Sequence, residues 1–136
     1  PLAAEQDRTM SRRIIIVDDE PAIREILRFN FEHDGFEVSV ASSEYETLTQ
    51  LVADDRMVAV IVGDLAPRPG SSRSLVHDIR EAFPDRWIPI IMVSTAARES
   101  DISAGLRVGV DHYFTKPFAI RELSAAVKEL TDSSAA

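Results

Sequence analysis

The sequence predicts one α/β domain: a doubly wound, five-stranded parallel sheet flanked by five helices. Two observations support this fold class. Continuous apolar runs recur along the 136 residues without alternation, and such runs are typical of strands that helices cover on both faces. Segments with helical spacing separate the runs, and right-handed βαβ connections between parallel strands place helices on both sides of an open sheet.

Five segments are predicted as strands because they are rich in apolar and β-branched residues. Three of them are continuous runs and should lie in the middle of the sheet: 13–17 (RIIIV), 57–62 (MVAVIV) and 88–93 (IPIIMV). The other two, 36–40 (FEVSV) and 110–114 (VDHYF), alternate more and should lie nearer the edges.

The intervening segments show the spacing and end signals of helices. Pro21 suits the first turn of the first helix, Asp19 or Glu20 is available to cap it, and Gly35 is placed to end it. Ser43 is placed to cap the second helix. A fourth helix over 97–108 is intrinsically weak, since it contains serine, aspartate and glycine. The apolar stripes of the other four helices are Ile23, Ile26, Leu27 and Phe31; Leu48, Leu51 and Val52; Leu75, Val76 and Ile79; and Ile120, Leu123, Val127 and Leu130.

Composition and end segments restrict the class of protein. The net charge of −8 argues against direct nucleic-acid contact, because phosphate binding needs clustered Lys and Arg. The absence of cysteine excludes disulfides and fits a cytoplasmic location. No apolar run approaches the roughly 20 residues that span a bilayer, so no membrane contact is expected. Residues 1–11 lack the apolar core of a signal peptide and are expected to be an extension or a cloning remnant; 12–131 form the domain, and 132–136 a tail or the start of a linker.

Polar residues collect where the predicted strands end, which is where open parallel sheets bind ligands. Asp18 and Asp19 follow the first strand, Asp64 the third, Ser94 the fourth and Lys116 the fifth. Three nearby carboxylates raise one another's pKa values unless a cation is present. Mg²⁺ prefers oxygen ligands and leaves positions for a phosphoryl group, which Lys116 would also attract. The set predicts phosphoryl transfer to a carboxylate.

The motifs VDDE, VGD, VSTA and YFTKPF, in this order and each closing a strand, resemble those of bacterial two-component receiver domains over residues 12–131. The resemblance implies a flavodoxin-like (CheY-like) sheet of strand order 2-1-3-4-5. It implies that Asp64 accepts a phosphoryl group from the phosphohistidine of a sensor histidine kinase or phosphotransfer protein, with Lys116 on the phosphoryl oxygens. Such a domain catalyses its own phosphorylation and slow dephosphorylation and is not an ordinary turnover enzyme.

The resemblance also implies a Mg²⁺ cofactor. Asp19 and Asp64 would bind the ion directly, Asp18 would assist through water, and the backbone carbonyl of Ala66 would be a further ligand. The two positions that follow Asp64 and Ser94 by two residues are Ala66 and Ala96, and neither alanine side chain can orient an attacking water. We therefore expect slow loss of the phosphoryl group.

A switch and an output surface are implied as well. Ser94 would move to bind the phosphoryl group, Tyr113 would turn inward behind it, and the Lys116–Pro117 bond would be cis. Segments such as EPAIREILRFNFEHDGFEV are similar to the receivers of winged-helix (OmpR/PhoB-like) transcription factors, which implies control of transcription and dimerisation through the fourth helix, fifth strand and fifth helix. Candidate residues for that contact are Asp111, Arg121, Glu122 and Lys128.

Departures from the family pattern keep other functions open. In the loop DLAPRPGSS, Arg68 stands where proline is usual and Ser72 where glycine is expected, and Gly63 before Asp64 is uncommon. A pseudo-receiver that binds a protein partner without phosphotransfer is therefore an alternative. A haloacid-dehalogenase-type phosphatase needs Asp-x-Asp after the first strand, and a flavodoxin-like cofactor binder needs a Ser/Thr/Gly-rich loop there; DDEP matches neither.

Overall fold

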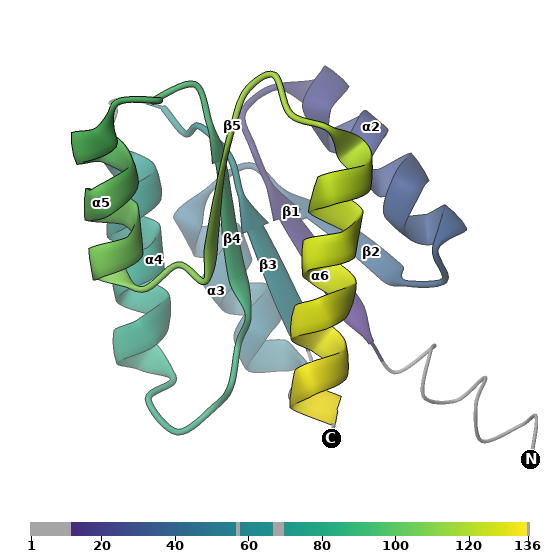
Figure 1. The fold of residues 1–136 in the computed structure, drawn as a ribbon. Helices are drawn as coiled ribbons and strands as arrows, with labels where there is room; N and C mark the ends of the chain where they lie inside the picture. Colours follow the sequence, from purple (N-terminus) through teal and green to yellow (C-terminus); the bar gives the residue numbers. More distant parts are fainter. Residues whose placement is uncertain (1–11, 57, 67–69, 136) are drawn as a thin grey trace, which may run out of the picture.

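The computed structural model describes residues 12–56, 58–66 and 70–135, in which strands and helices alternate along the chain (Figure 1). The elements are β1 (Arg13–Val17), α2 (Pro21–His33), β2 (Glu37–Ala41), α3 (Glu44–Ala53), β3 (Val58–Val62), α4 (Ser71–Ala82), β4 (Ile90–Ser94), α5 (Glu99–Val108), β5 (His112–Thr115) and α6 (Ile120–Ala135).

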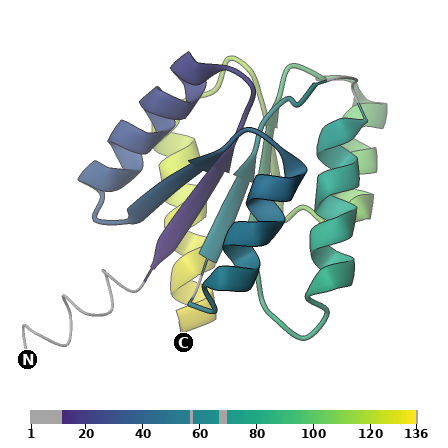
Figure 2. The same cartoon turned by 180° about the vertical axis from the view of Figure 1, so that it is seen from behind.

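The five strands form one parallel sheet in the order β2-β1-β3-β4-β5. This confirms the predicted flavodoxin-like topology, with the order reversing between β1 and β3. Helices α2 and α6 cover one face, and α3, α4 and α5 cover the other (Figures 1 and 2). In the part of the chain that is described, no helix is long and apolar enough to cross a membrane.

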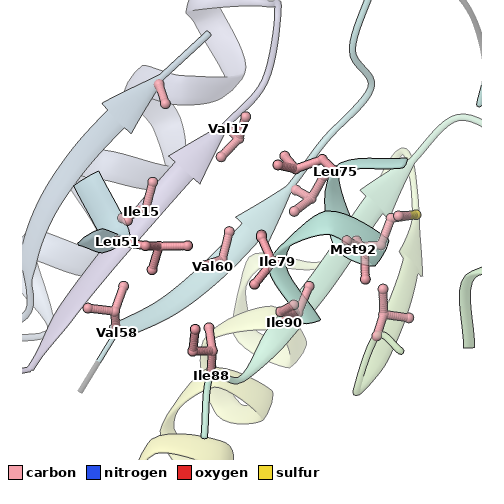
Figure 3. Close-up of a cluster of buried hydrophobic side chains, with 14 residues drawn as sticks. Ile15, Val17, Leu51, Val58, Val60, Leu75, Ile79, Ile88, Ile90 and Met92 are labelled. Atoms are coloured by element: carbon pink, nitrogen blue, oxygen red, sulfur yellow. The ribbon is translucent and has the colours of Figure 1, made fainter. Parts of the chain in front are cut away.

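Two apolar cores, one on each face of the sheet, explain why the central strands do not alternate. Ile14 and Ile16 of β1 face α2 and α6, where they pack in one cluster with Leu27 and Leu123. Ile15 and Val17, the residues in between, belong to the opposite cluster, with Leu51 of α3 and Leu75 and Ile79 of α4 (Figure 3). Because both sets are fully buried, an apolar residue is required at each of the positions 14–17.

Several boundaries differ from the sequence-based prediction. The fourth strand begins at Ile90 instead of 88, since Pro89 has no N–H for the ladder. Two stripe residues are wrong: Ile26 is 51% exposed and Val52 74% exposed, because each lies one position, or about 100°, away from the buried Leu27 or Leu51. Helix α6 runs to Ala135 and so includes most of the segment expected to be a tail.

Two of the predicted helix starts can be compared with the observed hydrogen bonds. Ser43 caps α3 as predicted, since its side chain accepts a hydrogen bond from the Glu46 N–H. The cap predicted for the first helix was wrong. Glu20 stands at the capping position of α2 without a side-chain bond to the helix, and its own N–H donates to Asp18 Oδ1 over 2.8 Å.

A network of polar side chains connects β1 to the C-terminal end of α3, at the end of the sheet where β1 begins. The Asp54 carboxylate accepts hydrogen bonds from Arg13 (2.9 Å) and from the side chain of Arg56 (2.7 Å for Nη2). Arg86 donates to the carbonyls of Leu51 and Asp54 and so binds the C-terminal end of α3. The Arg56 hydrogen bonds hold the pKa of Asp54 well below its usual range, against the opposing effect of burial.

Replacing Asp54 with asparagine should therefore destabilise the fold at neutral pH, by about 2 kcal/mol for lost charge-assisted hydrogen bonds. Because the folded pKa of Asp54 is lowered, its contribution is complete above the unfolded pKa of about 3.9 and is lost as the pH falls below it. Urea unfolding of wild type and Asp54→Asn from about pH 7 down to about pH 3 would measure a difference that shrinks below about pH 4. The control is Asp55→Asn, at the exposed neighbouring residue. Equal losses in the free energy of unfolding in both variants would contradict a stabilising role of the Asp54 network.

Candidate functional site

The register of the sheet brings the predicted site residues to one edge. Val17 of β1 lies beside Val62 of β3, and Val62 beside Met92 of β4. The residues that follow β1 and β3 therefore meet, and Ser94 and Thr115 pair at the ends of β4 and β5. Hydrogen bonds and ion pairs bring four of the predicted side chains into direct contact: Asp18, Asp64, Ser94 and Lys116.

Asp18 is buried, with 1% of its surface exposed, and it is paired with the ammonium group of Lys116. Its Oδ2 lies 3.0 Å from Lys116 Nζ, and its Oδ1 accepts the Glu20 N–H. Burial raises the pKa of Asp18, and the hydrogen bonds from Glu20 and Lys116 offset this only in part. Arg24 of α2 donates to the Asp18 carbonyl over 2.6 Å and fixes the backbone at this corner.

Asp64 is the more accessible acid of the contacting group, with 37% of its side chain exposed. Oδ1 accepts the Ser94 hydroxyl (2.5 Å), and Oδ2 accepts both the N–H and the hydroxyl of Thr95 (3.1 Å each). Lys116 Nζ lies 3.3 Å from the same Oδ2. Burial raises the pKa of Asp64, but the bonds from Ser94 and Thr95 and the charge of Lys116 outweigh it, so the pKa is lowered and the carboxylate is ionised at neutral pH.

Lys116 lies between Asp18 and Asp64, and its Nζ is also 3.9 Å from Glu20 Oε1. Only 10% of its side chain is exposed, and burial by itself would lower the pKa of its ammonium group. The neighbouring carboxylates of Asp18 and Asp64 outweigh the burial, so the pKa is raised and Lys116 stays charged. The Lys116–Pro117 peptide bond is cis, as the resemblance implied.

Asp19 and Ala66 meet at the outer rim of the site. The Asp19 N–H donates to the Asp64 carbonyl over 3.3 Å, and Asp19 Oδ2 accepts the Ala66 N–H. The segment 67–69, which includes Arg68, lies outside the described residues. Within 12–56, 58–66 and 70–135, no three acidic or histidine side chains converge as a ready metal site; Asp18 is turned to Lys116. The donors are nonetheless all hard oxygens, which fits Mg²⁺ in ligand chemistry.

Ser94 connects Asp64 to Tyr113. The Ser94 hydroxyl donates to Asp64 and accepts the Ala96 N–H over 3.0 Å, and the Tyr113 hydroxyl donates to the Ala96 carbonyl over 2.6 Å. The ring of Tyr113 lies against Gly105 of α5, where a Cβ would approach it to 2.8 Å. The glycine that weakens this helix in isolation is therefore required for packing.

One contact of Asp64 was not predicted from the sequence. The Thr95 N–H at Asp64 was missed, because a backbone donor leaves no signal in residue type.

Two of the residues suggested for a contact between protomers also have partners within the fold. Asp111 Oδ2 accepts the Ile90 N–H (2.8 Å) and lies 3.3 Å from Arg80. Lys128 lies 3.6 Å from Asp34.

Comparison with known proteins identifies the family. Residues 14–128 match the response regulator receiver domain. The chain belongs to this family. The receiver domain is also similar to the phosphate regulon transcriptional regulatory protein PhoB of Escherichia coli K12, with 33% identity over 88% of the chain, and to that of Klebsiella pneumoniae, with 32%. The chain spans about half the length of these relatives, 51% in each case.

Solved structures agree with this assignment. The receiver domain of Francisella response regulator 1452 has a TM-score of 0.80 at 25% identity, covering 90% of this chain and 98% of that one. The response regulator TrrA of Thermotoga maritima, solved in complex with Mg(2+)-BeF, has a TM-score of 0.73 at 30% identity, covering 88% and 98%.

The pairing of Asp18 with Lys116 predicts a pH-dependent cost of removing the lysine. In Lys116→Met the buried Asp18 would lose its partner, and its pKa would rise further. A group whose pKa is higher in the folded than in the unfolded protein stabilises the fold below its unfolded pKa, and this stabilisation is lost as the pH rises. The deficit relative to wild type should thus be small near about pH 4 and reach about 3 kcal/mol by about pH 7 in metal-free buffer.

Chemical unfolding across this pH range with a chelator present would measure this deficit. The control is Asp18→Asn added to Lys116→Met, which removes the charge that needs a partner and should flatten the pH dependence. A deficit that does not change with pH, or one that the second substitution leaves unaltered, would contradict the pairing.

Proposed function

We propose that this receiver domain takes a phosphoryl group onto Asp64 from the phosphohistidine of a sensor histidine kinase or phosphotransfer protein. The supporting observation is the state of Asp64. Its carboxylate is ionised and partly exposed, and it lies 3.3 Å from the ammonium group of Lys116. A carboxylate in this position is both a nucleophile and the neighbour of a cation that neutralises an incoming phosphoryl group.

In the proposed step a carboxylate oxygen of Asp64 attacks phosphorus, and the bond between phosphorus and the imidazole nitrogen breaks. The imidazole keeps the bonding pair and takes a proton from solvent, which leaves an acyl phosphate on Asp64. Lys116 and the donors of Ser94 and Thr95 already surround the carboxylate, so they lie close to where the phosphoryl oxygens would be.

The cofactor of the proposal is Mg²⁺, which supplies charge neutralisation at the phosphoryl oxygens when bound. Asp19, Asp64 and the Ala66 carbonyl would hold it, with Asp18 assisting. The similar protein TrrA was crystallised in complex with Mg(2+)-BeF, which supports the same class of cofactor here.

The domain is proposed to control transcription, because the similar PhoB proteins are named as transcriptional regulators. Its proposed location is the cytoplasm. No direct nucleic-acid contact is assigned to this acidic domain. The surface of α5, β5 and α6 is proposed to read the state of Asp64 and to allow dimerisation. Leu106 on α5, which is 50% exposed, and the exposed Arg121 and Glu122 on α6 belong to this surface.

The proposal is tested with Mg²⁺ and acetyl phosphate, in which acetate leaves as phosphorus bonds to Asp64. Wild type should gain one acid-stable, base-labile phosphoryl group, detected by intact mass, and Asp64→Asn should gain none. Asp55→Asn is the matched control. Mg²⁺ binding without an adduct would favour the pseudo-receiver, and steady turnover of phosphate esters would favour a phosphatase.

The lifetime of the phosphoryl group gives a separate prediction. Ala66 and Ala96 offer no side-chain donor or acceptor to an attacking water, so decay should be slow. Ala66→Asn adds an amide that can orient water and should speed decay by about tenfold, a typical effect of positioning a reactant. Decay of labelled protein after removal of the donor measures this. An unchanged or slower rate in Ala66→Asn would contradict the explanation.

A further inference from the structure

Gly63 and Ser72 join the end of β3 to the start of α4 beside the proposed acceptor. The Gly63 N–H donates to the Val17 carbonyl over 2.7 Å and continues the pairing with β1. The pairing of β3 with β4 ends at Val62 and Met92, so the Gly63 carbonyl lies beyond it. That carbonyl accepts a hydrogen bond of 2.6 Å from the hydroxyl of Ser72, a buried residue that is 5% exposed.

This hydrogen bond acts on the backbone of Asp64 itself. The Gly63 carbonyl and the Asp64 N–H belong to the same planar peptide unit, so a bond that holds the carbonyl also fixes the direction in which the Asp64 Cα leaves the strand. The next peptide is held as well, because the Asp64 carbonyl accepts the Asp19 N–H over 3.3 Å. Both peptides that flank the acceptor are therefore fixed, one by Ser72 and one by Asp19.

Gly63 has a second contact, with Asp18. A Cβ at position 63 would lie 1.8 Å from Asp18 Oδ2 and 2.5 Å from its Cγ. The Asp18 carboxylate thus occupies the space that a side chain would fill, and from there its Oδ2 reaches Lys116 at 3.0 Å. Any larger residue at position 63 would force the Asp18 carboxylate away from this position.

We propose that Ser72 and Gly63 are positioning residues for phosphorylation of Asp64: Ser72 aligns the acceptor through the Gly63 carbonyl, and the absent side chain of Gly63 admits Asp18 to Lys116. The inference rests on the proposed phosphotransfer function. It assigns a role to two residues that touch neither the phosphoryl group nor the metal directly.

The first experiment compares phosphorylation by acetyl phosphate at saturating Mg²⁺ and donor. Ser72→Ala should lower the rate constant by about tenfold, because the acceptor is no longer aligned. Ser72→Thr keeps the hydroxyl and should restore most of the rate. The control is Thr47→Val, which removes another buried hydroxyl, one that donates to the Ser43 carbonyl at the start of α3. It should lower the melting temperature without lowering the rate constant.

Amide hydrogen exchange without Mg²⁺ or donor measures the alignment separately. Exchange of the Asp19 amide, which donates to the Asp64 carbonyl, should be faster in Ser72→Ala than in wild type and unchanged in Thr47→Val. Equal phosphorylation rates in wild type and Ser72→Ala would overturn the role of Ser72 alone, whereas a wild type that takes no phosphoryl group would overturn the proposed function as well. An equal rate loss in Thr47→Val would show a general effect of stability and overturn the inference.

The second experiment tests Gly63 through Asp18, in metal-free buffer. Gly63→Ala should lower the melting temperature when Asp18 is present. In an Asp18→Ala background the clashing Oδ2 and Cγ are gone and only the Cβ of residue 18, at 3.0 Å, stays close, so the same substitution should have a much smaller effect. Equal losses in both backgrounds would overturn the role of Gly63. If Gly63→Ala does not fold, folding of the double variant Asp18→Ala, Gly63→Ala supports the same contact.

Discussion

The parallel pairing of β1 with β3 is the constraint on which the site depends. With Val17 in register with Val62, the acids that follow the two strands must leave the sheet at the same level. Like charges would then repel, and a carboxylate buried as deeply as Asp18 costs free energy unless it is paired. Lys116, delivered by β5 from the far edge of the sheet, provides that partner, so the fold and the chemistry of the site depend on the same strand order.

The environment gives the two acids on either side of Lys116 different properties. Asp18 is desolvated and its pKa is raised; Asp64 accepts three hydrogen bonds, lies closer to solvent and has a lowered pKa. A pair of carboxylates whose pKa values are moved apart is typical of sites in which each acid has a separate task. Here Asp18 is the buried partner of the Lys116 ammonium group, while Asp64 stays ionised and partly exposed, as the nucleophile of the proposed step must be.

The sequence was sufficient for the fold and for most of the site, because both depend on signals that residue type records. Buried runs identified β1, β3 and β4, and acids or hydroxyls after them identified Asp18, Asp64 and Ser94. The sequence could not show what depends on backbone direction. The Thr95 N–H at Asp64, the Ser72 bond to the Gly63 carbonyl and the Asp18 carboxylate over Gly63 are contacts of main-chain atoms. The rotation of each helix about its axis was also undetermined at the level of single residues, which is why Ile26 and Val52 were assigned to the apolar stripes although they are exposed.

The hydrogen bonds around Ser94 define how a change at Asp64 would reach the surface. Its hydroxyl can donate one bond, and in this state it donates to Asp64 while it accepts the Ala96 N–H. A phosphoryl group on Asp64 would compete for that donor, and any movement of Ser94 would displace Ala96, whose carbonyl holds the Tyr113 hydroxyl. Because the Tyr113 ring is in tight contact with Gly105, a shift of the ring toward α5 would displace that helix. That helix contains a glycine and β-branched residues of low helix propensity, so we expect α5 to respond to a charge change at Asp64.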